Sequence, residues 1–333
     1  LGATYYNPAR LALIEDPVFA INAKIYEFID IKIENYLFDK NDLSSSNFKG
    51  LPSMVSGTFK IKFLKNHQFA YALISRNRYE VDLSFNTGIV DNEFNNELPE
   101  VAKYFASTNL NYRLRENWFG LSWAKSITSN FSLGASLFAS YYNYSAGNSD
   151  QFTSINDLDQ VTNHSYKVSF DQKSYGAFLK IGAAWVFKSI EFGLNIDLPY
   201  LEVYSEGSFF NEEVLSGSNN GIDIFSLNNL DDINAKRIFP MGISLGTGIP
   251  FKKNQFHLNI SWNSAVGTYD RLDIPTLESI TDEEVYQYKL EEKLSSIVNF
   301  GMGAEIYINP IISAYGSFST DFSPFDIETS IIE

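Results

Sequence analysis

The stretch that decides the fold is YGAFLKIGAAWVFKSIEFGLNIDL, residues 175–198. In its first half apolar side chains occupy every second position, opposed by Gly176, Lys180 and Gly182. Across Lys188-Ser189 the alternation changes phase, so that the apolar positions become the even ones, from Ile190 onward. Period-2 alternation predicts two strands. A two-residue hairpin turn would place their apolar side chains on the same face of the sheet.

The same alternation recurs along the chain. We expect eleven strands, at residues 17–37, 57–64, 69–85, 106–127, 131–145, 164–187, 190–204, 236–251, 256–266, 284–308 and 311–320. The short connections between them are 65–68, 128–130, 188–189, 252–255 and 309–310, and the long ones are 38–56, 86–105, 146–163, 205–235 and 267–283. All short connections fall at one end of the sheet. Short periplasmic turns with long extracellular loops are typical of outer-membrane barrels.

Composition supports this interpretation. The 333 residues include 28 Phe, 20 Tyr and no Cys, and carry a net charge of −15. Many aromatic residues favour strands, and no apolar run approaches the roughly 18 residues of a membrane helix. The negative charge argues against nucleic-acid binding, which needs a basic face. The fold class predicted is therefore all-β, a transmembrane antiparallel up-and-down β-barrel with aromatic girdles that include Trp118 and Trp185.

An odd strand number leaves an open sheet edge, which lipid does not tolerate. The chain also stops at Glu333 after a polar tail, without a closing amphipathic strand. We therefore expect the barrel to be incomplete at its C-terminus in this sequence.

The opening LGATYYNPARLALIEDPVFAINAKIYEF, residues 1–28, resembles the N-terminal region of the FadL/TodX family of outer-membrane transport proteins. The resemblance rests on Asn7-Pro8-Ala9, followed by residues 10–16 and a strand from Pro17. Asn is a preferred N-cap residue and Pro suits the first helical position. The Phe- and Asn-rich, Cys-free style indicates a Bacteroidetes-type member.

The resemblance implies about fourteen strands, with residues 1–16 as the remnant of a luminal hatch and the Asn-Pro-Ala segment, and 17–333 as the barrel. It also implies passive uptake of hydrophobic compounds such as long-chain fatty acids across the outer membrane. The expected surroundings are outer-membrane lipid, lipopolysaccharide and other outer-membrane proteins. The long loops would be extracellular and the short turns periplasmic.

Family members release their cargo sideways through a kinked third strand. Here residues 69–85 are interrupted by Ser75-Arg76-Asn77-Arg78, and Ser75 and Asn77 share the phase of the apolar side. Polar groups would then point toward lipid. A lateral opening explains this, and so does a strand that has left the membrane.

Three lysines, Lys24, Lys62 and Lys180, fall on the luminal phase and could hold the carboxylate of a fatty acid. The alternative is a luminal network of salt bridges. We expect no catalytic residue, metal site or cofactor, because His67, His164 and His257 have no partner at metal-ligand spacing and no serine stands in a nucleophile-elbow sequence.

Two functions remain open. One is transport of hydrophobic compounds, favoured by small luminal residues that leave room inside: Gly134, Ser136, Gly242, Ser244 and Gly246. The other is a non-transporting barrel that serves as an accessory subunit of a larger outer-membrane complex for secretion, assembly or nutrient uptake.

Overall fold

The computed structural model describes residues 2–325 except 15, 17, 38–40, 65, 93–100, 218–220, 222 and 282–284. For residues 23–29, 33–37 and 41–52 it describes the backbone alone. Within these residues no helix is long and apolar enough to cross a membrane.

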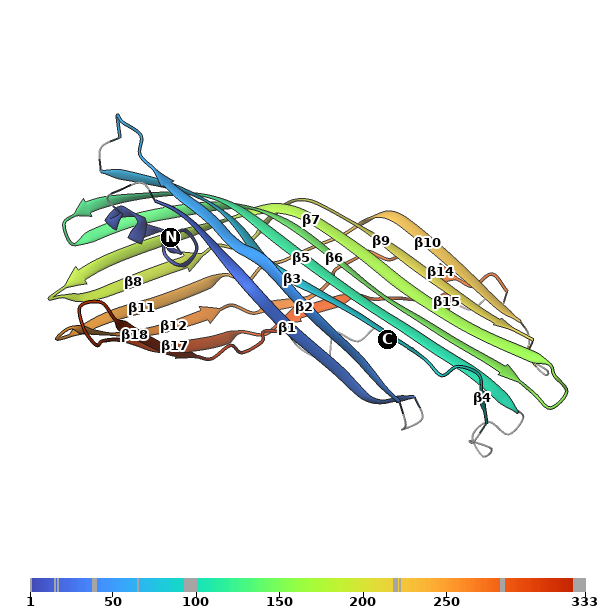
Figure 1. Ribbon diagram of the computed structural model, residues 1–333. Coiled ribbons are helices and arrows are strands. Elements are labelled where there is room, and N and C mark those ends of the chain that lie inside the picture. Colours follow the sequence, from blue (N-terminus) through green and yellow to red (C-terminus); the bar gives the residue numbers. More distant parts are fainter. Residues whose placement is uncertain are drawn as a thin grey trace.

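Among the described residues, an antiparallel sheet of fourteen strands forms the body of the molecule (Figure 1). Eleven of them follow one another edge to edge: β1 (Phe19–Leu37), β2 (Asn41–Phe59), β3 (His67–Asn86), β5 (Lys103–Thr128), β6 (Phe131–Ile155), β7 (Val161–Phe187), β8 (Ile190–Asp197), β11 (Gly242–Phe251), β12 (Asn254–Asn263), β17 (Ile297–Tyr307) and β18 (Ser313–Ser319). The other three are β4 (Val90–Asp91) on β5, β9 (Leu201–Ser216) on β7, and β10 (Ile224–Asn234) on β9. Each of the eleven strands expected from alternation overlaps one of the eleven in this path.

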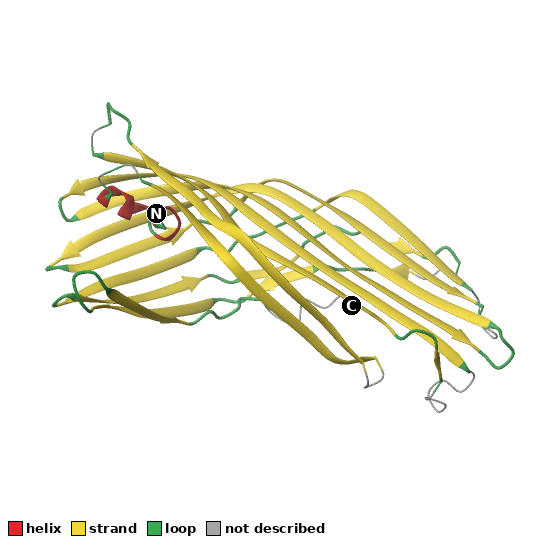
Figure 2. Cartoon of the chain, in the orientation of Figure 1, coloured by secondary structure: helices red, strands yellow, loops and turns green. Residues whose placement is uncertain are grey.

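The remaining elements are small. Two short helices, α1 (Ala3–Tyr6) and η1 (Pro8–Leu13), lie within the curve of the sheet at one end, as Figure 2 shows in red. Two minor sheets pair β13 (Val266–Asp270) with β16 (Glu291–Leu294) and β14 (Leu277–Glu278) with β15 (Val285–Tyr286). No ladder joins β1 to β18 among the described residues, so the described sheet is open there.

Several expected loops are strands. Strands β6 and β7 stay paired up to Ile155 and Val161, so only 156–160 remain of the expected loop 146–163. Residues 205–235 lie mostly in the β9–β10 hairpin, and most of 38–56 belongs to β2. These loop predictions were wrong because both faces of the strands mix polar and apolar residues there, so the alternation that marks a strand disappears. One end of the sheet is thus extended by long hairpins, and the opposite end has short turns.

The outer face of the sheet carries an apolar band near the short-turn end. On β6 the outward side chains are apolar or aromatic from Phe131 to Tyr141, and polar from Asn143. Ten residues of strand span about 33 Å, or about 25 Å in height when tilted by about 40°. That height matches the apolar band of an outer-membrane barrel.

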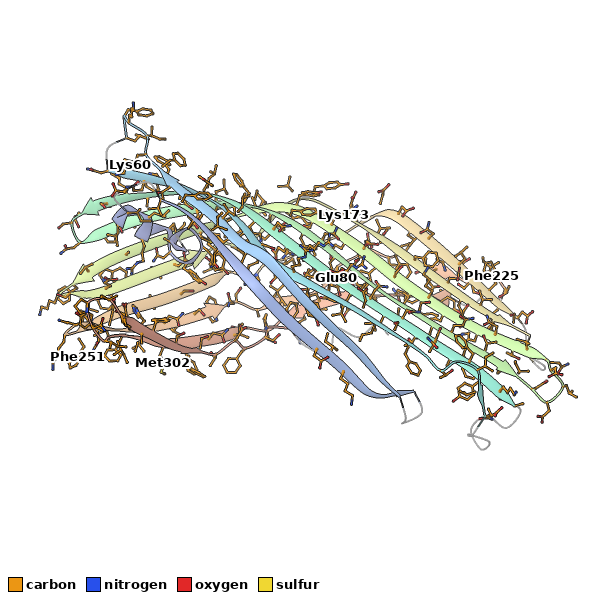
Figure 3. All side chains as sticks on the ribbon, in the orientation of Figure 1. Lys60, Glu80, Lys173, Phe225, Phe251 and Met302 are labelled. Carbon is orange, nitrogen blue, oxygen red and sulfur yellow. The ribbon has the colours of Figure 1, made fainter. Side chains whose placement is uncertain are left out.

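Aromatic residues mark both edges of this band. At the upper edge Tyr141, Tyr175 and Tyr204 form a row on neighbouring strands, with ring centroids 5.1 and 6.3 Å apart. At the lower edge the rings of Trp185 and Phe192 stack with their centroids 5.4 Å apart. Figure 3 shows Phe251 and Met302 on the part of the sheet that carries the apolar band, and Glu80 and Lys173 farther along the strands. Trp118 does not belong to a girdle as expected, because its side chain points inward and is 7% exposed.

Candidate functional site: the interior of the barrel

The N-terminal segment, defined as residues 2–14, lies against the inner wall of β5, β6 and β7. Asn7 fixes it there. Its Oδ1 accepts a hydrogen bond from the Ala9 backbone N–H at 3.0 Å, which caps η1. Its Nδ2 donates to the carbonyls of Ala183 in β7 and Leu194 in β8, at 3.0 and 3.2 Å. One side chain thus both begins the helix and attaches it to the wall.

Glycines in the wall make this close approach possible. A Cβ at Gly134 would lie 2.5 Å from the Pro8 carbonyl carbon and 2.6 Å from the Ala9 nitrogen. A Cβ at Gly182 would lie 2.3 Å from Asn7 Oδ1. Real Cβ atoms do not approach so closely, so only glycine allows the segment to sit in this position.

Serine hydroxyls hold the same segment from the wall. Ser132 donates to the Ala9 carbonyl at 3.0 Å, and Ser136 to the Thr4 carbonyl at 2.9 Å. Gly134 and Ser136 were expected to leave room in the lumen. They do not, because the N-terminal segment fills that space. Ser244 and Gly246 do line a cavity of about 550 Å³ beside the segment.

The three predicted lysines are not brought together. Lys180 is buried at 6% exposure, and its Nζ lies 2.9 Å from both carboxylate oxygens of Asp197. Asp197 also accepts from Asn195 at 2.6 Å. Lys62 lies exposed in the turn between β2 and β3, and the side chain of Lys24 lies outside the described residues. Lys180 thus belongs to an internal salt bridge. This agrees with the alternative that luminal lysines form salt bridges and do not bind a fatty acid.

Strand β3 has a bulge at the predicted interruption. The register against β5 shifts between Ser75, opposite Asn117, and Asn77, opposite Glu116, which leaves Arg76 as the extra residue. The phase therefore inverts, and the Asn77 amide donates to Glu116 at 2.7 Å inside the barrel. The sequence pattern places Asn77 on the outer face together with Ser75, and this prediction is wrong. The bulge moves the side chains that follow it to the other face of the sheet.

The ladder between β2 and β3 ends at the same level. It runs from Phe59 opposite Phe69 to Met54 opposite Ile74, and β3 continues to Asn86 paired with β5 alone. Beyond Ile74 the described backbone of β2 and β3 is therefore not joined by a ladder.

A fully buried carboxylate, Glu116, stands beside this bulge. Besides Asn77, it accepts hydrogen bonds from the Trp118 indole N–H at 2.7 Å and from Arg237 at 2.8 Å. Arg237 lies in the connection between β10 and β11, so the ion pair links the β5 wall to a distant part of the chain. The Arg237 guanidinium also lies over the rings of Tyr142 and Phe239, at 3.7 and 4.2 Å from their centroids.

Aromatic side chains pack around this pair. Trp118, Phe138 and Phe178 form a buried cluster, with ring centroids 4.5 to 5.7 Å apart. Phe239 packs against them. Along β5 this layer lies between the N-terminal segment and the extended end. We name it the central layer.

Beyond the central layer lies an apolar cavity of about 520 Å³. Its lining includes the apolar or aromatic side chains Leu110, Tyr112, Tyr144, Ala146, Val168, Phe170 and Leu290. Its charged lining residues are Arg271, Lys289, Glu291, Glu292 and Lys293. The guanidinium of Arg271 lies 3.3 Å from Glu292, whereas Lys289 has no ion-pair partner among the described residues.

Hydrogen bonds fix the charged side of this cavity. Arg271 donates to Gln172 at 2.6 Å and to the Tyr142 hydroxyl at 3.1 Å. Tyr269 in β13 donates to Glu292 at 3.0 Å. Burial raises the pKa of the Tyr269 hydroxyl, and the neighbouring Glu292 carboxylate raises it further. Tyr269 therefore stays a neutral donor at physiological pH.

Sequence reasoning missed Glu116, Arg237 and Arg271. Glu116 stands in the polar run RLREN, residues 113–117, where it resembles solvated charge. Its position two residues before Trp118, on the same face of the strand, was the feature from which an inward side chain could have been predicted. Arg237 and Arg271 lie outside long alternating strands, so no periodicity marks them.

No protein-family model and no curated protein sequence matches the chain. Among solved structures, the toluene transporter TodX of Pseudomonas putida superposes with a TM-score of 0.57 at 15% identity, over 97% of this chain and 80% of TodX. A FadL homologue of Pseudomonas aeruginosa gives 0.54 at 13% identity, over 97% and 76%. The TodX deltaS2S3 mutant, a monoaromatic hydrocarbon channel, gives 0.56 at 13% identity, over 98% and 79%. The chain therefore has the fold of the FadL/TodX family.

Proposed function

We propose that this chain is an outer-membrane β-barrel that takes up hydrophobic compounds. The observation that carries the proposal is the apolar cavity of about 520 Å³ at the extended end of the sheet. Ligand sites of this size are mostly apolar and have a few polar groups that orient the ligand. Similarity to a toluene transporter and a FadL homologue supports the same substrate class.

The membrane position follows from the outer face. The apolar band between the two aromatic rows has the height of a bilayer core, and the outward residues beyond it are polar. We place the extended end, with the apolar cavity, outside the cell and the short turns in the periplasm. Residues 1–16 then form a luminal segment and 17–333 the membrane barrel.

Long-chain fatty acids are the proposed example of cargo. The apolar lining would bind the acyl chain, and Lys289 would meet the carboxylate, because it has no acidic partner among the described residues. This role differs from the one expected for Lys180, whose charge is already balanced by Asp197.

The bulge at Arg76 supports a sideways exit. The β2–β3 ladder ends beside it, and the wall residue Asn77 is connected through Glu116 to the central layer. A rearrangement of the central layer would therefore reach the edge of β3 where the wall is not hydrogen-bonded to β2.

Ligand binding tests the proposal. A tryptophan in place of Ala146 would fill the apolar cavity, whereas a tryptophan in place of Ala139, on the outer face of the same strand, would face lipid. The wild type and Ala139→Trp should bind a radiolabelled fatty acid in detergent, and Ala146→Trp should bind it at least about tenfold more weakly. Equal binding by all three proteins would refute the cavity as the site.

A second function is favoured by the central layer. The Glu116–Arg237 pair, the aromatic cluster and the N-terminal segment each occupy part of the described lumen. A filled lumen suits a barrel that transports no compound itself and serves as an accessory subunit of an outer-membrane complex. Gentle extraction from its own membrane distinguishes the two, since an accessory subunit purifies with a second membrane protein in fixed ratio.

A further inference from the structure

Two arginines stand side by side on the outer face, just above the apolar band. Arg78 of β3 is directly opposite Arg115 of β5 in the ladder that resumes after the bulge. Both side chains are exposed. In the same ladders Ser75, Asn117, Tyr141 and Tyr175 form the outward row one step below them, at the upper edge of the band.

The level of these arginines is that of lipid head groups. Arg115 is two residues from Asn117 and four from the apolar Phe119, which corresponds to about 7 and about 13 Å along the strand. Cationic side chains at this height, beside a row of tyrosines, face the interface between acyl chains and water.

Neither arginine has a carboxylate partner in the part of the chain whose side chains the structure describes. No carboxylate of the described residues lies within 4.0 Å of either guanidinium. Glu80 and Asp82, which follow Arg78 on the outward face of β3, form ion pairs with Arg113, with N–O distances of 3.4 and 3.6 Å. Opposed side chains in an antiparallel ladder have Cβ atoms about 5 Å apart, and like charges in that position are destabilising.

A phosphate between the two guanidinium groups would remove this repulsion. Guanidinium binds phosphate oxygens through paired, charge-assisted hydrogen bonds, and two such groups match the charge of one phosphate. We propose that Arg78 and Arg115 form a binding site for the phosphate of a lipid in the membrane leaflet at the extended end, whose acyl chains lie on the apolar band below. The proposal rests on the membrane position of the band and not on uptake.

Native mass spectrometry of the folded barrel in detergent tests this site. The probes are lipid A with its phosphates and the same lipid after dephosphorylation. The wild type should bind the phosphorylated form about tenfold or more tightly, in line with at least one charge-assisted contact. An Arg78→Gln/Arg115→Gln variant should lose this preference, and Arg78→Lys/Arg115→Lys should keep part of it.

The matched control is Lys167→Gln. Lys173 of β7 lies at the level of Arg115, because both are opposite Asn143 of β6. Lys167 is an outward cation of the same strand, six residues and about 20 Å above that level, so its loss should leave the phosphate preference unchanged. Equal binding of both lipids by the wild type would overturn the proposal, and so would an unchanged preference in the Gln/Gln variant. Displacement of the lipid by inorganic phosphate would also overturn it, because the acyl chains should hold the lipid in place. The wild-type comparison decides the question even where a variant does not fold, and none of these measurements depends on transport.

Discussion

Glu116 of β5 and Arg237, 121 residues farther along the chain, form an ion pair of 2.8 Å with side-chain exposures of 0% and 9%. The pair joins the β3–β5 wall at the bulge to the connection before β11. It therefore connects the edge of β3 to the layer that closes the middle of the lumen.

Glu116→Gln should destabilise the barrel strongly. The substitution leaves the Arg237 guanidinium buried without its counter-charge, which costs about 3–5 kcal/mol. Urea unfolding in detergent measures the change. Glu191→Gln is the control, since its pair with Arg10 is exposed and contributes less than about 1 kcal/mol. Equal effects of the two substitutions would contradict a structural role for the central pair.

Gly134→Ala should release the N-terminal segment. The added methyl group would collide with the backbone of Pro8 and Ala9, and the segment cannot move aside without losing the hydrogen bonds of Asn7. Limited proteolysis should then cleave residues 2–14 faster than in the wild type. Gly246→Ala, on the same inner face, has only the Leu258 carbonyl at 3.8 Å and should leave the cleavage rate unchanged.

Substitutions of Asn7 separate capping from attachment. An aspartate in its place would still accept from the Ala9 N–H and cap the helix, but it cannot donate to the carbonyls of Ala183 and Leu194. If attachment to the wall dominates, Asn7→Asp and Asn7→Ala should both increase the cleavage of residues 2–14. A protected N-terminus in Asn7→Asp would show that the cap alone holds the segment.

Deleting Arg76 should remove the bulge. Regular pairing of β3 with β5 would then continue past Ser75, because Asn77, which already pairs with Glu116, would follow Ser75 directly. Uptake of hydrophobic compounds should fall while the barrel still folds, as measured by circular dichroism. Uptake at the wild-type rate would place the exit elsewhere.

The main sheet follows from the sequence because apolar residues alternate with small or polar residues along its strands. The turn between β7 and β8 is predicted to the residue, since the apolar positions change phase across Lys188-Ser189. The β9–β10 hairpin is invisible to the same reasoning, because side chains such as Asn211 and Asn228 make its faces similar in polarity. The bulge at Arg76 is equally hidden, because a register shift depends on the partner strand.

The interior was predictable only in part. Asn7-Pro8-Ala9 indicated a helix start, and the structure shows that Asn7 also attaches this start to β7 and β8. The sequence pattern suggests empty space at Gly134, because a sequence does not tell which segment fills a lumen. Glu116 and Arg237 pair across 121 residues, a separation that no local pattern reports.

Uptake into vesicles reconstituted with the purified protein tests the central claim most directly. A radiolabelled fatty acid should accumulate faster with the wild type and with Ala139→Trp than with Ala146→Trp, whose apolar cavity is filled. Uptake by the wild type no faster than by protein-free vesicles would contradict transport, and uptake by Ala146→Trp equal to the wild type would contradict a route through the cavity.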